Sequence, residues 1–197
     1  MSASKRLSLD RALTQLIESL VRASPDKLGH VKVQNILVLA GAARRGNRAS
    51  IRPLKYAHKD PVAYRKPTIS IDGVPILYEI CLRPLFFLEG SAKDRIQTIA
   101  HELWHISKKF DGSLEESRKH ENVSDELIHT EISKIVNACQ IATEIYEILS
   151  HSGELRIRSW KIRPPSRIPK DSNDRLIFDE NDLFENIVIQ ANSRKNI

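Results

Sequence analysis

The sequence predicts an α+β fold in which a small mixed or antiparallel sheet packs against two main helices. Apolar residues recur at helical spacing in residues 91–110 and again in residues 124–150. Shorter apolar runs outside these segments, bounded by turn residues, indicate strands. With 41% hydrophobic residues in 197, the chain can fill one sizeable core.

The chain begins with a shorter helical pattern. Ser8 is a candidate N-cap, and an apolar stripe continues to about Ala23, where Ser24-Pro25 predicts a break. A strand is predicted over about residues 33–40. We expect residues 1–27 to form an N-terminal helix, residues 28–165 the main domain, and residues 166–197 a polar, partly ordered tail.

Residues 41–66 are strongly basic, with eight Lys or Arg residues against one acidic residue. Arg44, Arg45 and Arg48 are candidates for binding nucleic-acid phosphates, with Tyr56 and Tyr64 available to stack on bases. The segment contains no recognised nucleic-acid motif, which favours a solvated loop with a short strand near residue 51.

Two strands are predicted next, over residues 69–71 and 74–82. Asp72-Gly73 lies between them and is a common two-residue turn of a β-hairpin.

The segment from Ser91 carries the main chemical signal of the chain. Ser91 can cap a helix whose apolar stripe continues to Phe110, and Asp111-Gly112 predicts its end. His101, Glu102 and His105 form an H-E-x-x-H motif, in which two histidines one turn apart can bind the same metal ion. At about 100° per residue, both histidines point away from the centre of the apolar stripe. We therefore expect them to face a cleft, with Glu102 placed to activate a water molecule.

A catalytic zinc site has three protein ligands and leaves one position for water. His120 is the preferred third ligand, and Asp111, Glu126 and His129 are the alternatives. His30 is a remote candidate for a fourth ligand, which a closed structural site would require.

The second half of the chain predicts a long helix and a strand. Ser124 can cap a helix that continues to about Ser150, packed behind the motif helix. Apolar alternation over residues 155–162 predicts a strand, and a phase slip at Ser159 indicates a β-bulge.

Composition narrows the class of protein. Cys81 and Cys139 fall in predicted core elements, which favours free thiols in a reducing compartment and leaves a disulfide open. The sequence has no apolar run that could span a membrane and no signal peptide, so we expect a cytoplasmic protein without a membrane partner. The net charge is +10 over residues 1–67, −6 over 68–150 and +2 over 151–197. This asymmetry is compatible with an anionic partner.

Residues 28–122 resemble the putative phage metallopeptidase domain family. The resemblance is carried by His101-Glu102-Leu103-Trp104-His105-Ile106, by Phe110-Asp111-Gly112, by Arg118 and His120, by residues 35–41 and by Tyr78-Glu79-Ile80. It implies a zincin-like fold, similar in layout to SprT-type proteases. It also implies Zn²⁺ held by His101, His105 and His120, with Glu102 as the catalytic residue.

In zincin-like folds a strand ahead of the motif helix borders the cleft. The predicted strand over residues 74–82 is the candidate here, able to bind an extended peptide, with Tyr78 near the cleft as a substrate contact. Tyr78 and Arg118 are also candidate donors to an oxyanion.

Three functions therefore compete. The first is a zinc metallopeptidase acting on a protein or peptide, in which Glu102 transfers the proton of water to the leaving amine. The second is a nucleic-acid-associated module with a structural zinc ion, and the third is a SprT-like protease of DNA-bound proteins. The sequence leaves the oligomeric state and the natural substrate open.

Overall fold

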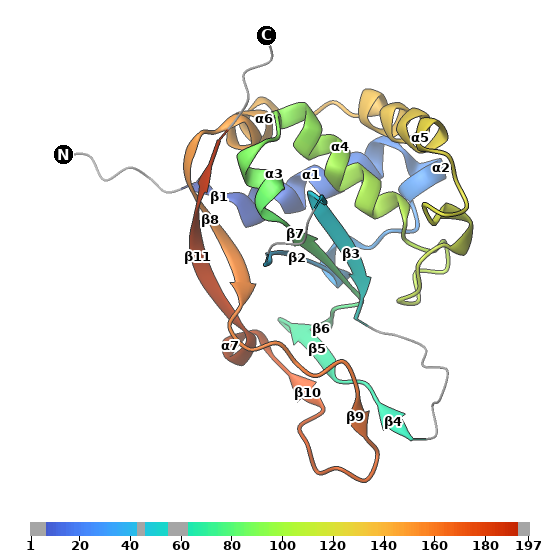
Figure 1. The fold of residues 1–197 in the computed structure, drawn as a ribbon, viewed down its shortest axis with the longest axis vertical. Helices are drawn as coiled ribbons and strands as arrows, with labels where there is room; N and C mark the ends of the chain where they lie inside the picture. Colours follow the sequence, from blue (N-terminus) through green and yellow to red (C-terminus); the bar gives the residue numbers. More distant parts are fainter. Residues whose placement is uncertain (1–6, 43–45, 55–62, 193–197) are drawn as a thin grey trace, which may run out of the picture.

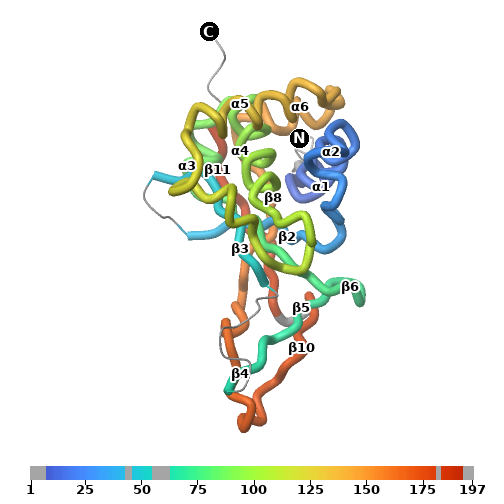
Figure 2. The backbone as a smooth tube through the Cα atoms, turned by 90° about the vertical axis from the view of Figure 1, so that its right-hand side faces the viewer, coloured from blue at the N-terminus to red at the C-terminus, as the bar shows by residue number. Residues whose placement is uncertain are grey.

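The structure is a computed structural model that describes residues 7–42, 46–54 and 63–192. It has an α+β architecture with mixed sheets. Figure 1 shows the larger helices gathered beside the main sheet, and small strands forming a narrow extension at the other end. Figure 2 shows the same extension from the side. The candidate site lies in the larger part, between the sheet and its helices.

The main sheet has the strand order β1-β8-β2-β7-β3, and β11 pairs with β8 on its other side. The strands are β1 (Leu7–Ser8), β2 (Ile36–Ala40), β3 (Ala49–Pro53), β7 (Tyr78–Leu82), β8 (Gly153–Trp160) and β11 (Phe184–Ala191). Strand β2 runs parallel to β7 and β8, whereas β3 is antiparallel to β7 and β11 is antiparallel to β8. The sheet is therefore mixed, as predicted.

The helices are α1 (Leu9–Ala23), α2 (Pro25–Leu28), α3 (Pro84–Leu88), α4 (Ala92–Trp104), α5 (Asp125–Ala138), α6 (Thr143–Ser150) and α7 (Glu180–Leu183), with the 3-10 turns η1 (Val33–Asn35) and η2 (Glu116–Arg118). The apolar faces of α1, α4, α5 and α6 share one core with the sheet. Helix α1 ends at Ala23, as predicted, although the Ser8 side chain makes no capping hydrogen bond.

The narrow extension contains β4 (Tyr64–Arg65), β5 (Thr68–Ile71), β6 (Val74–Pro75), β9 (Ile168–Pro169) and β10 (Ile177–Phe178). The predicted hairpin turn is present, because β5 and β6 are antiparallel and both Asp72 and Gly73 have positive φ. Residues 74–82 do not form one strand, however. Strand β6 pairs with β5 in the extension, whereas β7 lies inside the main sheet.

Two predictions for the second half of the chain are wrong. The long helix is two helices, α5 and α6, separated at residues 139–142. Strand β8 has no bulge, because it pairs residue by residue with β11 from Gly153 to Trp160. The apparent phase slip arises because Leu155 and Ile157 face the main core, while Trp160 packs with Phe184 against a second apolar cluster.

Strand β11 lies in the polar tail and was not predicted. Its eight residues pair along the whole of β8, while α1 supplies a large part of the main core. The main sheet and its core thus include residues from outside the predicted range 28–165. Both cysteines are free thiols, with Cys81 buried and Cys139 partly buried.

Candidate metal centre

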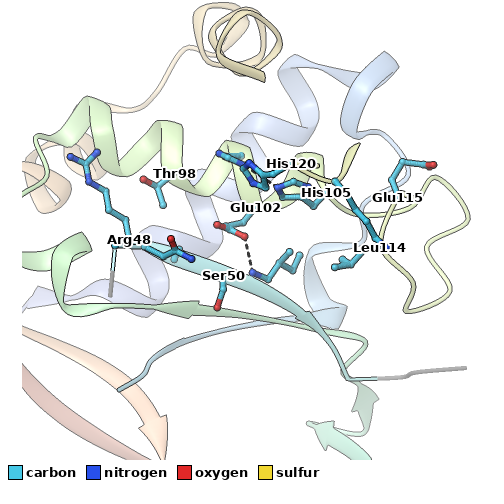
Figure 3. A pocket seen from close by; sticks show the side chains of 14 residues that line it. Arg48, Ser50, Thr98, Glu102, His105, Leu114, Glu115 and His120 are labelled. Atoms are coloured by element: carbon cyan, nitrogen blue, oxygen red, sulfur yellow. Dashed lines mark hydrogen bonds between the residues drawn. The ribbon is translucent and has the colours of Figure 1, made fainter. Parts of the chain in front are cut away.

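Three histidine side chains converge at the open side of α4. The Nε2 atom of His101 lies 2.9 Å from that of His105 and 3.1 Å from that of His120. Figure 3 shows the two labelled histidines, His105 from the end of α4 and His120 from the loop opposite. Within the described residues, His101, His105 and His120 form a group that could hold one metal ion.

The histidines of α4 are placed by local structure and by one buried side chain. Ser91 is the N-cap of the helix, as predicted, and it forms a capping box with Asp94. Arg95 is 1% exposed and donates hydrogen bonds to the backbone carbonyls of Phe86, Phe87, Leu149 and Asn192. It therefore ties α4 to α3, to the end of α6 and to the residue after β11.

Helix α4 ends at Trp104, a turn and a half before the predicted end, and His105 is its C-cap. The chain reverses through Phe110 and Gly112, which both have positive φ, and a β-bridge joins Ile106 to Leu114. The Phe110 ring packs against Tyr78, which stabilises a backbone conformation unusual for a non-glycine residue. This reversal returns the chain along α4 and brings His120 to the other two histidines.

Arg118 fixes the returning segment to the helix. It donates a 2.6 Å hydrogen bond to the Trp104 carbonyl, and its guanidinium lies over the Trp104 ring at 5.1 Å. Arg118 therefore neutralises an unpaired carbonyl at the C-terminus of α4. Its Nη1 donor is engaged there and Arg118 does not line the histidine cleft, so the structure gives no support to Arg118 as an oxyanion donor.

The three nitrogen donors fit a divalent metal ion. Burial, followed by the nearby His120, lowers the pKa of His101 to about 4, and burial with the neighbouring histidines lowers the pKa of His105 to about 4. Both imidazoles are thus neutral near pH 7 and can offer lone pairs to a metal. Three nitrogens bound tetrahedrally to zinc at about 2.0–2.1 Å are about 3.3 Å apart, close to the spacing found here.

Glu102 lies beside the histidines but points to the sheet. Its Oε2 atom accepts a 2.7 Å hydrogen bond from the backbone amide of Ile51 in β3, drawn as the dashed line in Figure 3. Burial raises the pKa of Glu102 to about 7, while the Ile51 bond and Arg83 act in the opposite direction. A carboxyl group with such a pKa can accept and return a proton near neutrality.

A cleft of about 490 Å³ opens between α4 and β3. It is lined by residues from β3 and the segment before it, from α4, and from the returning loop: Gly46, Asn47, Arg48, Ala49, Ser50, Ile51, Thr98, His101, Glu102, His105, Leu114, Glu115, Lys119 and His120. Among the described residues, β3 pairs with β7 alone, so its other edge borders the cleft.

The strand predicted to bind an extended peptide has no free edge in the structure. Strand β7 is paired on both sides, by β2 and β3, and has no edge for a peptide. Tyr78 is 0% exposed, and its hydroxyl accepts a hydrogen bond from the Gly112 amide and donates to the Ser113 carbonyl. It supports the loop beneath the site and does not face the cleft.

The alternative ligands lie outside the histidine cluster. Asp111 is exposed and accepts hydrogen bonds from Ser113, while Glu126 is exposed on the first turn of α5. His129 lines a side cavity together with His101 and His120 but is not a member of the cluster. His30 lies with Nε2 3.3 Å from the Ile106 carbonyl, away from the cluster.

Of the predicted nucleic-acid contacts, Arg44 and Arg45 lie outside the described residues. Arg48 lines the cleft, with Nη1 3.4 Å from Asp94. Nucleic-acid binding stays a prediction. No helix in the described ranges is both long enough and apolar enough to cross a membrane.

Three contributing residues were missed by the sequence analysis: Ile51, Arg95 and Leu114. A short strand near residue 51 was predicted, but its contact with Glu102 depends on tertiary packing that leaves no local sequence signal. In the sequence, nothing distinguishes Arg95 from an exposed polar position of an amphipathic helix.

The fold and the cluster define an α+β protein with a three-histidine, potential metal-binding cleft. Comparison of the chain with known protein families, with characterised proteins and with solved structures finds no match.

Proposed function

We propose that the protein is a zinc-dependent metallopeptidase with a zincin-like arrangement, related to the phage metallopeptidase domains that its motifs resemble. The convergence of His101, His105 and His120 beside the buried carboxyl of Glu102 is the observation that carries the proposal. These residues would hold Zn²⁺, which supplies Lewis acidity and lowers the pKa of water when bound.

The chain's own residues then have distinct roles. The three imidazoles would hold the metal through Nε2. Glu102 accepts a proton from the attacking water and returns it to the leaving amine, which its raised pKa allows near pH 7. Its hydrogen bond to Ile51 holds the carboxylate in the cleft wall, next to where a scissile bond would lie.

The outer edge of β3, which no other described strand pairs with, is the proposed binding site for the substrate, and its Ile51 amide is already bound to Glu102. An extended peptide can add to a sheet edge through main-chain hydrogen bonds, which recognises an unfolded segment with little dependence on side chains. We therefore expect a flexible protein or peptide as the substrate, lying between β3 and α4.

The test is proteolysis by the full chain with its metal content measured in parallel. Zinc-loaded wild type is incubated with a mixture of unstructured proteins and peptides, and products are identified by mass spectrometry. Glu102→Gln retains size but not the base, so it should keep zinc and lose cleavage by roughly a hundredfold or more. Cleavage that is undiminished in Glu102→Gln at equal zinc content contradicts the proposal.

A further inference from the structure

A second cavity, of about 440 Å³, lies on the face of the main sheet opposite the helices. Strand β7 shows this division of faces, because Tyr78, Ile80 and Leu82 belong to the core beneath the helices. Glu79 and Cys81 alternate with them and line the second cavity. This cavity shares no lining residue with the histidine cleft.

The cavity is strongly basic for its size. Arg52, Arg83 and Arg163 line it, and Glu79 is the acidic residue among them. Arg163 donates a 2.6 Å hydrogen bond to Glu79 Oε2, and Arg83 is bound to Ala42 and Ser50. Within the described ranges, the guanidinium of Arg52 has no hydrogen bond or ion pair. The cavity thus has positive charge available for an anion.

Several buried polar atoms of the same cavity residues lack partners in the described structure. They are Oε1 of Glu79, Nε of Arg83 and Nε1 of Trp160. Glu79 is 0% exposed and Arg83 is 3% exposed, so bulk water does not satisfy these atoms. These two donors and one acceptor could therefore bind a ligand that accepts at least two hydrogen bonds and donates one.

We propose that this cavity binds a phosphate group that carries a proton, either as inorganic phosphate or as a phosphate monoester. The phosphate oxygens would accept from the arginines and from Trp160, since arginine forks match such oxyanions in geometry and charge. The P–O–H group would donate to Glu79 Oε1. Sulfate has the same shape but no proton to donate, so its oxygen would face the Glu79 carboxylate with unfavourable charge.

An adjacent hollow leaves room for an organic part of the ligand. It has a volume of about 380 Å³ and shares Arg52, Trp160 and Arg163 with the phosphate cavity. A monoester could therefore place its phosphate against Glu79 and its organic portion along Trp160. The inference does not depend on the metal site, because the two cavities lie on opposite faces of the sheet.

The test is calorimetric titration of the full chain with inorganic phosphate, sodium sulfate, adenosine 5′-monophosphate and glycine, at constant ionic strength. At about pH 6 a good part of a phosphate monoester still carries its second proton. We expect phosphate to bind and sulfate and glycine to bind at least about tenfold more weakly, the usual effect of a lost charged hydrogen bond. Tighter binding of the nucleotide than of phosphate identifies a monoester site, whereas equal binding identifies free phosphate as the ligand.

Two variants and one control locate the site. Arg52→Ala should weaken phosphate binding by about tenfold or more, while Arg156→Ala, an exposed arginine of β8 outside the cavity, should leave it unchanged. Glu79→Gln offers an amide donor in place of an acceptor and should reduce the preference for phosphate over sulfate. Because Glu79 is buried and its variant could unfold, the partly exposed Arg52 provides the independent test.

Equal affinity for sulfate and phosphate, or phosphate binding unaffected by Arg52→Ala, overturns the proposal. So does a crystal structure grown in phosphate in which Glu79 Oε1 is bonded to water alone.

Discussion

The carboxylate of Glu102 on α4 accepts a 2.7 Å hydrogen bond from the backbone amide of Ile51 on β3. One bond thus joins the motif helix to the strand that borders the cleft, and it uses a main-chain donor that no side-chain substitution other than proline removes. The bond lies in a buried setting, where it only partly offsets the cost of a charged carboxylate.

Replacing Glu102 by Gln should stabilise the metal-free protein at high pH. The folded-state pKa is raised to about 7 from 4.5, so the folded state holds its proton more tightly than the unfolded state does. The contribution of Glu102 to stability is therefore greatest below pH 4.5, falls as the pH rises to about 7, and then levels off. Gln carries no charge, so the variant does not lose this stability as the pH rises. We expect Glu102→Gln to be more stable by about 2–3 kcal/mol at pH 8 and to approach wild type near pH 4.

The measurement is urea unfolding of chelator-treated protein at several pH values. Glu126→Gln, on the exposed first turn of α5, is the control for loss of one carboxylate. A Glu102→Gln variant that is less stable than wild type at pH 8 would show that the ionised carboxylate is favourable where it lies.

The choice of the third ligand can be tested by metal content. Wild type should purify with about one zinc per chain, and His120→Ala should lose most of it because two nitrogens remain. Asp111→Ala, Glu126→Ala and His129→Ala should retain zinc, since these residues lie outside the cluster. Elemental analysis of the four variants checks this. Full zinc in His120→Ala, with loss in one of the others, would reassign the ligand.

Arg95 should be among the most sensitive positions of the fold. Its replacement by Leu leaves four carbonyls without their buried donor, at a cost of about 3 kcal/mol or more. The exposed Arg11 of α1 provides a matched Arg→Leu control with little expected effect. Denaturant midpoints of the two variants measure the difference, and equal midpoints would mean that the carbonyls find other partners.

The nucleic-acid prediction depends on Arg44, Arg45 and Arg48. If they bind phosphates, replacing all three by Glu should abolish binding of a DNA oligonucleotide at low salt. For wild type, the logarithm of the binding constant should fall linearly with the logarithm of the salt concentration, with a slope of about −0.9 for each phosphate bound. Reversal of the exposed Arg156, Lys161 and Lys170 is the control. Binding that responds equally to both sets indicates attraction by net charge alone.

Much of the site could be predicted because its signals are local. The capping box of Ser91 and Asp94 and the spacing of His101 and His105 each depend on residues within one helix. Asp72-Gly73 likewise encodes its own turn. His120 required more, since its approach depends on the chain reversal at Phe110 and Gly112, yet the Asp111-Gly112 turn signal lies at this reversal.

The errors arose where tertiary packing decides the structure. The apolar spacing continues across residues 139–142 because α5 and α6 face the same core, so no Gly or Pro marks the break. Tyr78 is buried and supports the loop beneath the site, so it does not contact the cleft as predicted. Only the sheet order shows that β3 is the strand that borders the cleft. Strand β11 is polar on one face and gains its stability from pairing with β8, which its own sequence does not reveal.

X-ray absorption at the zinc edge of the purified full chain tests the central claim most directly. We predict a first shell of three imidazole nitrogens at about 2.0–2.1 Å and one oxygen that exchanges with solvent. The same shell is expected in Glu102→Gln, because Glu102 is bound to Ile51 and is not a ligand. A shell of four protein donors, or a protein that takes up no zinc while His101, His105 and His120 are intact, would contradict the account.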